Sequence, residues 1–439
     1  MFATMKLLVI ALVVAAADAG PLLMNDGVPL AIFADADLLV MNDGVPLAGL
    51  ADAGPLVMND GVPLAGFEKF LLTDAAKTGA VCLDGSPGGG YIRRGDPKKW
   101  IIFHQGGGWC GSDANCAQRA NCSQSPPSPK GCIMGKTCCA LGSSTVWGPT
   151  YTDKYEGSEI FADPRFANYT QVYAMYCDGG SWTGDAQKAV VVNGKKIWYK
   201  GRRLLDALLD HMLEQEGLKS ADELMFGGCS AGGLTCYLHC DYVASRMPVA
   251  VKTKCICDAM FSANVPHYDG QVGFPAGMKW GYSAWNSSGS ANAACAASFA
   301  APADRWKCFF GQETAKHVKT PLFVLNSKYD SWQGPAIIGC STALKACPAA
   351  AQTYWVKYGK AMAAAATALP PQHGAFIANC RAHCQTGTAS AWSGTTVDGV
   401  AMGAAFKAWY DDKPGNHKHV EACPGNDGSC GADKCSGKR

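Results

Sequence analysis

The stretch ELMFGGCSAGGL, residues 223–234, places Ser230 between two glycines, with one residue on either side of the serine. Residues 223–226 have the composition of a short buried strand, and the segment after the serine has the length and spacing of a helix. A tight turn from a strand into a helix needs small flanking residues, which Gly228 and Gly232 supply. Because glycine fills 51 of the 439 positions, this motif needs partners elsewhere in the chain before it predicts a reactive serine.

The rest of the chain alternates between short apolar segments and longer segments of helical periodicity. Predicted strands are residues 99–104, 171–176, 223–226, 254–257 and 321–325. Predicted helices are residues 202–215, 231–246 and 354–369. Strands that alternate with helices predict an α/β fold whose mostly parallel central sheet carries helices on both faces. An active site in such a fold is expected at the carboxyl ends of the strands.

A second glycine cluster, FHQGGGWC at residues 103–110, follows the first predicted strand. A serine that attacks an ester needs backbone N–H groups that stabilise the developing oxyanion. Glycine lets the backbone approach a substrate closely, so Gly107 and Gly108 are candidates for this role, together with the N–H of Ala231. A plain glycine turn is the alternative. The presence of Ser230 downstream favours the functional interpretation.

The acid that orients a catalytic histidine is expected after the serine and before the histidine. Asp330 lies just beyond the predicted strand at residues 321–325, where a carboxylate could reach a histidine at the edge of the sheet. Other acids after Ser230 remain competitors: Asp241, Asp258, Asp269 and Asp304.

Two histidines, His373 and His383, follow Asp330 outside the polar C-terminal tail. His239 lies within the predicted helix after the serine and is expected to point away from it. Cys380 and Cys384 flank His383, and a disulfide at either could hold its loop rigid. The spacing favours His383 as the base but leaves His373 open.

The chain divides into four predicted segments. Residues 1–19 carry one lysine, an apolar run and a small-residue cleavage pattern, which predicts a secretory signal peptide; the run is too short for a membrane anchor of about 20 residues. Residues 20–66 contain three identical copies of MNDGVPLA at a period of 17, and we expect a poorly ordered leader there. Residues 67–412 form the predicted catalytic domain, and residues 413–439 a cysteine-rich tail.

Composition limits the classes of partner. The 38 basic and 36 acidic residues leave a net charge of +2 and form no long basic run, so nucleic acid is not expected as a partner. The 22 cysteines predict disulfides of an oxidising compartment, and they lack the Cys-x-x-Cys spacing of a zinc site. Three sequons suit a secreted glycoprotein: Asn121, Asn168 and Asn286.

Several motifs together resemble a known family. They are VCLDGSPGGGY (81–91), HQGGGWC (104–110), YCDGGSWTGD (176–185), GCSAGGL (228–234), HCD (239–241), TPLFVLNSKYDSWQ (320–333) and HCQT (383–386). They occur in the order found in plant pectin acetylesterases, a family that also contains the animal carboxylesterase Notum. The resemblance covers roughly residues 68–411. It departs from the family at Gln105, where plant members usually carry a glutamate.

The resemblance implies a secreted, disulfide-stapled α/β-hydrolase-like carboxylic-ester hydrolase that removes acetyl groups from a cell-wall polysaccharide such as pectin. It implies Ser230, Asp330 and His383 as the catalytic triad. The oxyanion hole would be formed by Gly107, Gly108 and Ala231. It also implies that His383, rather than His373, is the base, and that no metal or organic cofactor takes part.

Three other interpretations compete with this one. A lipid or protein O-deacylase of the Notum kind would need a deep apolar pocket. A catalytically silent polysaccharide-binding protein would not need the triad and both oxyanion segments, whose joint presence argues against it. A thiol-redox role for Cys229 is the third, but the absence of a Cys-x-x-Cys pattern favours a buried, paired cysteine whose partner the sequence does not name.

Overall fold

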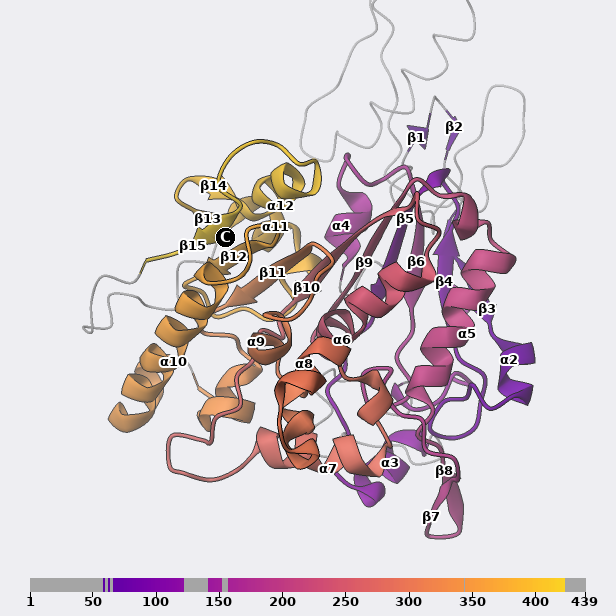
Figure 1. Cartoon of the computed structure of the whole chain (residues 1–439), viewed down its shortest axis with the longest axis horizontal. Helices are drawn as coiled ribbons and strands as arrows, with labels where there is room; N and C mark the ends of the chain where they lie inside the picture. Colours follow the sequence, from indigo (N-terminus) through magenta and orange to yellow (C-terminus); the bar gives the residue numbers. More distant parts are fainter. Residues whose placement is uncertain are drawn as a thin grey trace, which may run out of the picture. The chain divides into compact units, whose positions relative to one another are not determined.

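A nine-stranded sheet forms the centre of the molecule (Figure 1). The computed structural model describes residues 66–121, 141–151, 157–342 and 344–422, and the backbone of two short strands before them. The strands in spatial order are β15 (Lys418–Val420), β12 (Gly374–Ala378), β11 (Leu322–Ser327), β10 (Lys252–Asp258), β9 (Glu223–Cys229), β5 (Asp96–His104), β6 (Tyr169–Ala174), β4 (Gly89–Arg93) and β3 (Glu68–Leu71). All neighbours from β15 to β6 are parallel, whereas β4 is antiparallel to both β6 and β3.

Both faces of this sheet are covered. Every residue of β6, β11 and β12 is buried, whereas a strand with one solvated face would alternate buried and exposed residues. The longer helices are α5 (Gly201–Glu214), α6 (Ala231–Arg246), α7 (Phe274–Ala284), α10 (Ala349–Thr367) and α12 (Met402–Tyr410). The shorter ones are α2 (Thr73–Lys77), α3 (Asp113–Ala120), α4 (Ser158–Ala162), α8 (Ala293–Ser298), α9 (Gly311–Thr314) and α11 (Ala389–Gly394). The fold is therefore the predicted α/β-hydrolase-like arrangement.

Three two-stranded ribbons lie outside the sheet. They are β1 (Met58–Asn59) with β2 (Val62–Pro63), β7 (Val190–Val192) with β8 (Lys195–Ile197), and β13 (Thr396–Val397) with β14 (Val400–Ala401). The first ribbon falls in the third copy of the MNDGVPLA repeat, so its Asp-Gly pair stands between the two strands. Asp-Gly between short extended segments is a common signal for a hairpin.

The carboxyl end of the sheet carries the segments that build the candidate site. In Figure 1, α3, α7 and the β7–β8 ribbon gather at one end of the molecule. These segments follow β5, β10 and β6 respectively, and those three strands are parallel. The end at which they gather is therefore the end at which the loops after the parallel strands meet.

All eight predicted elements are present. The strand predicted at residues 223–226 is longer, because β9 continues through Gly227 and Gly228 to Cys229 while it pairs with β10 on one side and β5 on the other. The sheet also extends past residue 412, where the tail was predicted to begin: Lys418–Val420 pairs in parallel with β12. The predicted signal peptide, nearly all of the leader and residues 423–439 lie outside the described residues.

Disulfides cross-link the described part of the chain, as predicted from its cysteine content. Two of them, Cys236–Cys257 and Cys240–Cys255, connect α6 to the neighbouring strand β10. The others with both cysteines described are Cys82–Cys177, Cys110–Cys116, Cys229–Cys384, Cys295–Cys308 and Cys340–Cys347. Such cross-links are typical of proteins that fold in an oxidising compartment.

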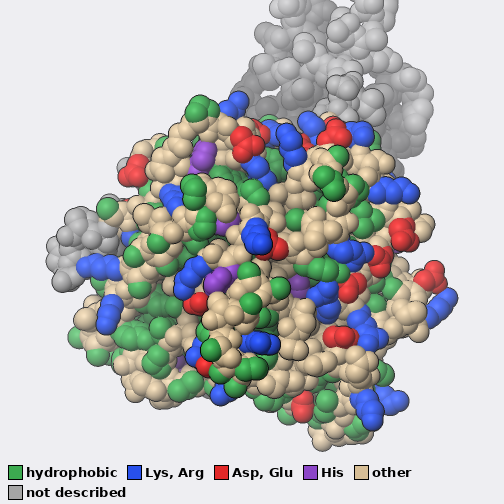
Figure 2. All heavy atoms as spheres, in the orientation of Figure 1, with side chains coloured by type: hydrophobic (Ala, Val, Ile, Leu, Met, Phe, Trp, Pro, Cys, Tyr) green, Lys and Arg blue, Asp and Glu red, His purple; other side chains and the backbone are tan. Residues whose placement is uncertain are grey.

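The surface carries charges of both signs. Figure 2 shows lysine and arginine side chains interspersed with aspartate and glutamate over the face in view. Within the described part of the chain, no helix combines the length and the hydropathy required to cross a bilayer.

The start of α6 packs very closely against the end of β5. A Cβ atom on Gly232 would lie 2.0 Å from the carbonyl oxygen of His104, a backbone atom that has little freedom to move. A Cβ atom on Gly228 would lie 2.5 Å from the backbone of Gly232. Gly228 and Gly232 are thus required because the backbone approaches each of them too closely for a Cβ atom to fit.

We predict that Gly232→Ala destabilises the fold by about 3 kcal/mol or more, because the methyl group overlaps the His104 carbonyl. Gly277→Ala in α7 is the matched control: no heavy atom lies within 4 Å of the added Cβ, and alanine favours a helix by about 1 kcal/mol over glycine. Urea denaturation of both variants measures the difference. Equal stability of the two variants would contradict the packing argument.

Candidate active site

Ser230 occupies the turn between β9 and α6. Its φ of 58° and ψ of −120° lie in a region that residues with a side chain rarely adopt. Such a strained turn holds a serine at the end of a strand and at the N-terminus of a helix. The glycine loop passes directly beside it, since a Cβ atom on Gly106 would lie 2.8 Å from the Cβ of Ser230.

His383 and Asp330 form a hydrogen-bonded pair. The Nδ1 atom of His383 lies 2.9 Å from each carboxylate oxygen of Asp330. Asp330 follows β11 and is buried, and its Oδ1 also accepts the backbone N–H groups of Trp332 and Gln333. Nδ1–H donation to this carboxylate leaves Nε2 of the neutral imidazole unprotonated, as a general base requires.

A disulfide joins the serine turn to the histidine loop. Cys229 directly precedes Ser230, Cys384 directly follows His383, and the two cysteines are bonded. The two sulfur atoms and a ring nitrogen of His383 all lie within 4.8 Å of one another. The structure therefore brings the three predicted triad residues to neighbouring positions after β9, β11 and β12. It also identifies the partner of Cys229 that the sequence left open.

The two bonded cysteines and the histidine, Cys229, His383 and Cys384, form the cluster of potential metal ligands found in the described part of the chain. Cysteine binds metals as a thiolate, and a disulfide sulfur has no thiolate charge. With this bond formed, the cluster cannot act as a metal centre.

The glycine loop after β5 is held from behind by two side chains. Gly107 and Gly108 have φ of 139° and 65°, which glycine adopts freely. The Gly107 carbonyl accepts a hydrogen bond from Nη2 of Arg119 at 2.8 Å. The Gly108 carbonyl accepts one from the hydroxyl of Tyr176, also at 2.8 Å. Because a trans peptide points its N–H away from its carbonyl, the Gly108 N–H faces away from Arg119.

Arg119 and Tyr176 were not among the predicted site residues. Arg119 lies on α3 and is buried, and burial lowers the pKa of its guanidinium. Tyr176 belongs to the YCDGGSW motif, whose presence carried the family resemblance without indicating a role for this residue. Arg119 comes 11 residues after Gly108, the last glycine of the loop. The sequence did not predict its role, because the hydrogen bond joins α3 to the glycine loop and is seen only in the folded chain.

Asp178, in the same motif, supplies the charge that faces this arginine. Its Oδ2 accepts the backbone N–H groups of Gly180 and Trp182, and it attracts the guanidinium of Arg119. Burial of its carboxyl raises the pKa to about 7 in spite of these contacts.

Aromatic side chains border the imidazole. The rings of Trp109, Phe274 and Trp332 contact one another at centroid distances of 5.2 to 5.3 Å. The Trp332 ring lies 6.1 Å from that of His383, and the Trp109 indole N–H donates to the Ser181 hydroxyl. All three rings are partly exposed, so they form a wall that a substrate beside His383 would contact.

The competing histidine, His373, is buried and fully paired. Its Nδ1 accepts the backbone N–H of Leu322, and its Nε2–H donates to the carbonyl of Val318. Burial lowers its pKa to about 4. The buried His239 points away from solvent within α6, and burial lowers its pKa to about 3. Neither imidazole is available to Ser230 as a base.

Gln105 occupies a structural position. It is 8% exposed, and its side-chain carbonyl accepts the backbone N–H of Tyr176 at 2.9 Å. Gln105, where the resemblance implies a glutamate, thus links the glycine loop to the segment that follows β6.

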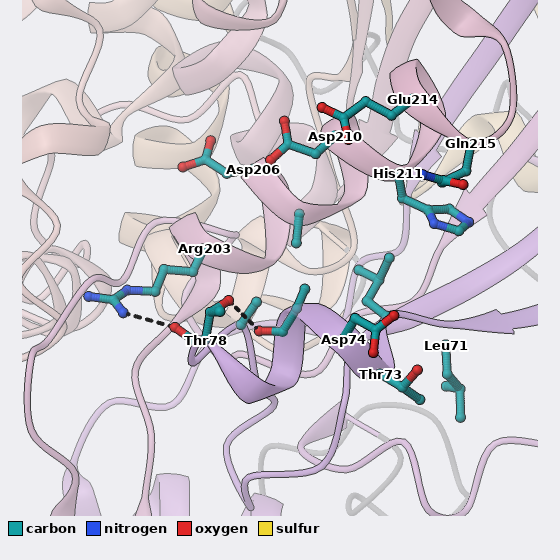
Figure 3. Close-up of a pocket in the computed structure, with 14 residues that line it drawn as sticks. Leu71, Thr73, Asp74, Thr78, Arg203, Asp206, Asp210, His211, Glu214 and Gln215 are labelled. Carbon is teal, nitrogen blue, oxygen red and sulfur yellow. Dashed lines mark hydrogen bonds between the residues drawn. The ribbon is translucent and has the colours of Figure 1, made fainter.

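A groove between α2 and α5, of about 620 Å³, lies apart from these residues (Figure 3). None of the predicted site residues lines it. Three of its acids are ion-paired, as Asp74 is with Lys77, Asp206 with Arg202 and Asp210 with Arg246. These ion pairs neutralise three of the carboxylates that line the groove.

The sequence profile of the pectinacetylesterase family matches residues 65–430. The chain belongs to the pectinacetylesterase family. Pectin acetylesterase 11 of Arabidopsis thaliana is 32% identical over 362 residues, which cover 78% of this chain and 87% of that protein. The palmitoleoyl-protein carboxylesterase NOTUM of Schmidtea mediterranea is 27% identical over 58% of this chain and 47% of that protein. The Wnt deacylase Notum from Drosophila shares the fold, with a TM-score of 0.67 at 20% identity over 82% of this chain and 97% of that chain.

Membership of the pectinacetylesterase family confirms the predicted enzyme class, a carboxylic-ester hydrolase. The sequons of this family member lie at positions of differing exposure. Asn286 is exposed, although its amide donates to the Asp185 carbonyl. Asn168 is partly buried, and the third residue of its sequon, Thr170, is buried. Asn121 is partly exposed, and the remainder of its sequon lies outside the described residues.

Buried ionisable groups surround the site of this pectinacetylesterase-family chain. Burial lowers the pKa of His104 to about 3, as it lowers that of His239 to about 3 and that of His373 to about 4. Burial raises the pKa of Asp258 to about 6, as it raises that of Asp178 to about 7. The folded chain thus keeps these histidines neutral and takes up protons at these aspartates in mild acid.

The free energy of unfolding should fall as the pH drops from about 5.5 to 4.5. In this window the three histidines are protonated only when unfolded, where their pKa is 6.5, and the two aspartates are protonated only when folded. Three protons against two mean that these five groups contribute a net uptake of one proton on unfolding, or about 1.4 kcal/mol per pH unit, to the slope. Chemical denaturation at the two pH values measures the slope. Asp178→Asn should make it steeper by about 1.4 kcal/mol per pH unit, because the folded variant no longer takes up the proton of Asp178, and an unchanged slope would contradict the assignment.

Proposed function

We propose that Ser230, His383 and Asp330 are the catalytic triad of this carboxylic-ester hydrolase. The observation that supports the proposal is the hydrogen bond of the His383 imidazole to the buried Asp330 carboxylate, on a loop disulfide-bonded to the residue before Ser230. An imidazole held in this tautomer presents Nε2 as the base that a serine hydroxyl needs at neutral pH.

In the proposed mechanism, Ser230 Oγ attacks the acyl carbon while its proton passes to Nε2 of His383. The resulting imidazolium is stabilised by the Asp330 carboxylate. It then donates the proton to the departing alkoxide, so that the acyl group remains on the serine. Water, deprotonated by the same imidazole, attacks the acyl carbon; the bond to Ser230 Oγ breaks, Oγ takes back the proton from the imidazolium, and the carboxylic acid is released.

The oxyanion of each tetrahedral intermediate is proposed to bind the N–H groups of Gly107, Gly108 and Ala231. The Ala231 N–H lies in the first turn of α6, where it has no carbonyl partner within the helix. The contacts of Arg119 and Tyr176 with the loop carbonyls support this role, because they hold the donors in place before the charge develops.

We propose acetylated cell-wall polysaccharide, such as pectin, as the substrate. Pectin acetylesterases 11 and 5 of Arabidopsis are 32% and 29% identical to this chain, and both align over at least 80% of their own length. The wall formed by Trp109, Phe274 and Trp332 fits this substrate, since flat aromatic rings contact the apolar face of a sugar beside the imidazole.

We further propose that the protein is secreted to the extracellular space or cell wall. The predicted signal peptide and the disulfides of the described residues support this location. Its exposed sequon at Asn286 suits a glycoprotein. A Notum-like deacylase remains the second candidate, because NOTUM proteins align with 58% of this chain at 26 to 27% identity.

We predict that Ser230→Ala lowers kcat for an aryl acetate on the order of 10⁶-fold, because the covalent step is lost. His383→Ala should be similarly inactive, and Asp330→Asn should lose about 10⁴-fold by favouring the wrong tautomer. His373→Ala is the control: it should unfold more easily yet retain turnover where it is folded, since its imidazole hydrogen-bonds to the backbone of Leu322 and Val318, away from Ser230. Turnover by Ser230→Ala equal to that of the native enzyme would refute the triad.

A second prediction concerns the acyl group. The purified protein should release acetate from acetylated pectin, and its kcat/KM for an aryl acetate should exceed that for a long-chain aryl ester by at least about 10-fold. A preference for the long chain would favour the Notum-like activity. Absence of turnover on all these esters, together with binding to pectin, would favour a silent polysaccharide-binding protein.

A further inference from the structure

The loop that carries His383 has a covalent attachment to the nucleophile turn. Cys384, the residue after His383, is disulfide-bonded to Cys229 with their Cα atoms 5.5 Å apart. Cys384 has φ of 55° and ψ of 63°, a left-handed conformation that residues with a side chain seldom adopt. The bond closes a loop of 155 residues and places the histidine beside the serine turn.

A second attachment comes from Asp258, the last residue of β10. Its Oδ2 accepts both the backbone N–H of Thr386, at 2.9 Å, and the Thr386 hydroxyl, at 2.7 Å. Its backbone carbonyl accepts the N–H of Ser230 at 3.0 Å. One residue therefore contacts the nucleophile turn through its main chain and the histidine loop through its side chain.

Asp258 does not replace Asp330 as the acid that orients the imidazole. His383 Nδ1 contacts both oxygens of Asp330, whereas the side chain of Asp258 accepts hydrogen bonds from the backbone N–H and the hydroxyl of Thr386. Asp258 is fully buried and its charge attracts that of His383. It was one of the competing acids in the sequence, and its place beneath the loop gives it a different role.

The contact with Asp330 controls the orientation of the imidazole but leaves the distance from His383 to Ser230 to the loop that carries it. Transfer of a proton from a serine needs a separation of about 2.6 to 3.2 Å, and a displacement of 1 Å can lower a rate by about 10²-fold. Tethers on the same loop, within three residues of the histidine, limit such a displacement.

We infer that the Cys229–Cys384 disulfide and Asp258 are positioning groups, which hold the loop of His383 at the distance from Ser230 that proton transfer requires. The inference rests on the proposed triad. Neither group touches the reacting atoms in this role. Their loss should lower kcat while the KM for a small ester, which reflects the glycine loop and aromatic wall, stays nearly unchanged.

The disulfide is tested with the double variant Cys229→Ala/Cys384→Ala, which leaves no unpaired thiol. Cys240→Ala/Cys255→Ala is its control, because that buried disulfide joins α6 to β10 and does not reach the histidine loop. Steady-state kinetics on an aryl acetate, below both melting temperatures, should show kcat reduced about 10- to 100-fold for the first variant, with KM within about twofold. The control should keep the native kcat.

Asp258 is tested with a graded pair, which also covers the case in which the double cysteine variant fails to fold. Asp258→Ala removes the acceptor of Thr386 and should lower kcat about 10- to 100-fold. Asp258→Asn retains a carbonyl oxygen that can accept the Thr386 N–H, so it should recover a large part of the lost kcat. A structural role alone would change the melting temperature of both variants without this difference in kcat.

The outcomes separate this inference from the proposed function. Native kcat in folded Cys229→Ala/Cys384→Ala or in Asp258→Ala, while Ser230→Ala is inactive, would overturn the positioning role and leave the triad intact. An equal loss of kcat in the Cys240→Ala/Cys255→Ala control would also overturn it, because the effect would then be a general one of removing a disulfide. Full activity of Ser230→Ala would instead refute the proposed function itself.

Discussion

The close approach of α6 to the end of β5 is the contact on which the rest of the active-site region depends. With only a hydrogen atom on Gly232, the helix begins against the carbonyl of His104, and no side chain would fit between them. The glycine loop starts at the next residue, so this contact also brings Gly106 against Ser230. Ser230 and the glycine loop are therefore set side by side by backbone packing, before any polar contact is considered.

Buried charges then hold the loops around this centre. Arg119 supports the glycine loop, Asp178 faces Arg119, and Asp258 supports the histidine loop. Burial of an ionisable group is unfavourable unless the group is hydrogen-bonded. The backbone groups or charges that each of these residues contacts offset the free-energy cost of burying it. Polar groups fixed in this way do not reorganise during the reaction, which is the property that electrostatic catalysis needs.

Prediction from the sequence succeeded where the signal was local. The strands and helices with clear periodicity were predicted correctly, and so was the turn at Ser230, from the small residues that flank it. It failed where a segment is defined only by its neighbours. The edge strand at Lys418–Val420 follows a polar, glycine-containing stretch and has a strand's conformation because β12 offers it an open edge. The sequence near Arg119 did not indicate that this side chain is buried against the glycine loop, because an arginine is ordinarily exposed.

The sequence by itself determined the class of fold, the serine turn and the order of acid and histidine, because apolar periodicity and glycine spacing are properties of adjacent residues. Only the tertiary structure shows that the His373 imidazole hydrogen-bonds to the backbone of Leu322 and Val318, whereas His383 lies against Asp330. It also decided the partner of Cys229, since Cys384 is 155 residues away and only strands that lie side by side in the sheet bring their ends together. The spacing of residues along a chain does not indicate such proximity, because it arises from the packing of the sheet.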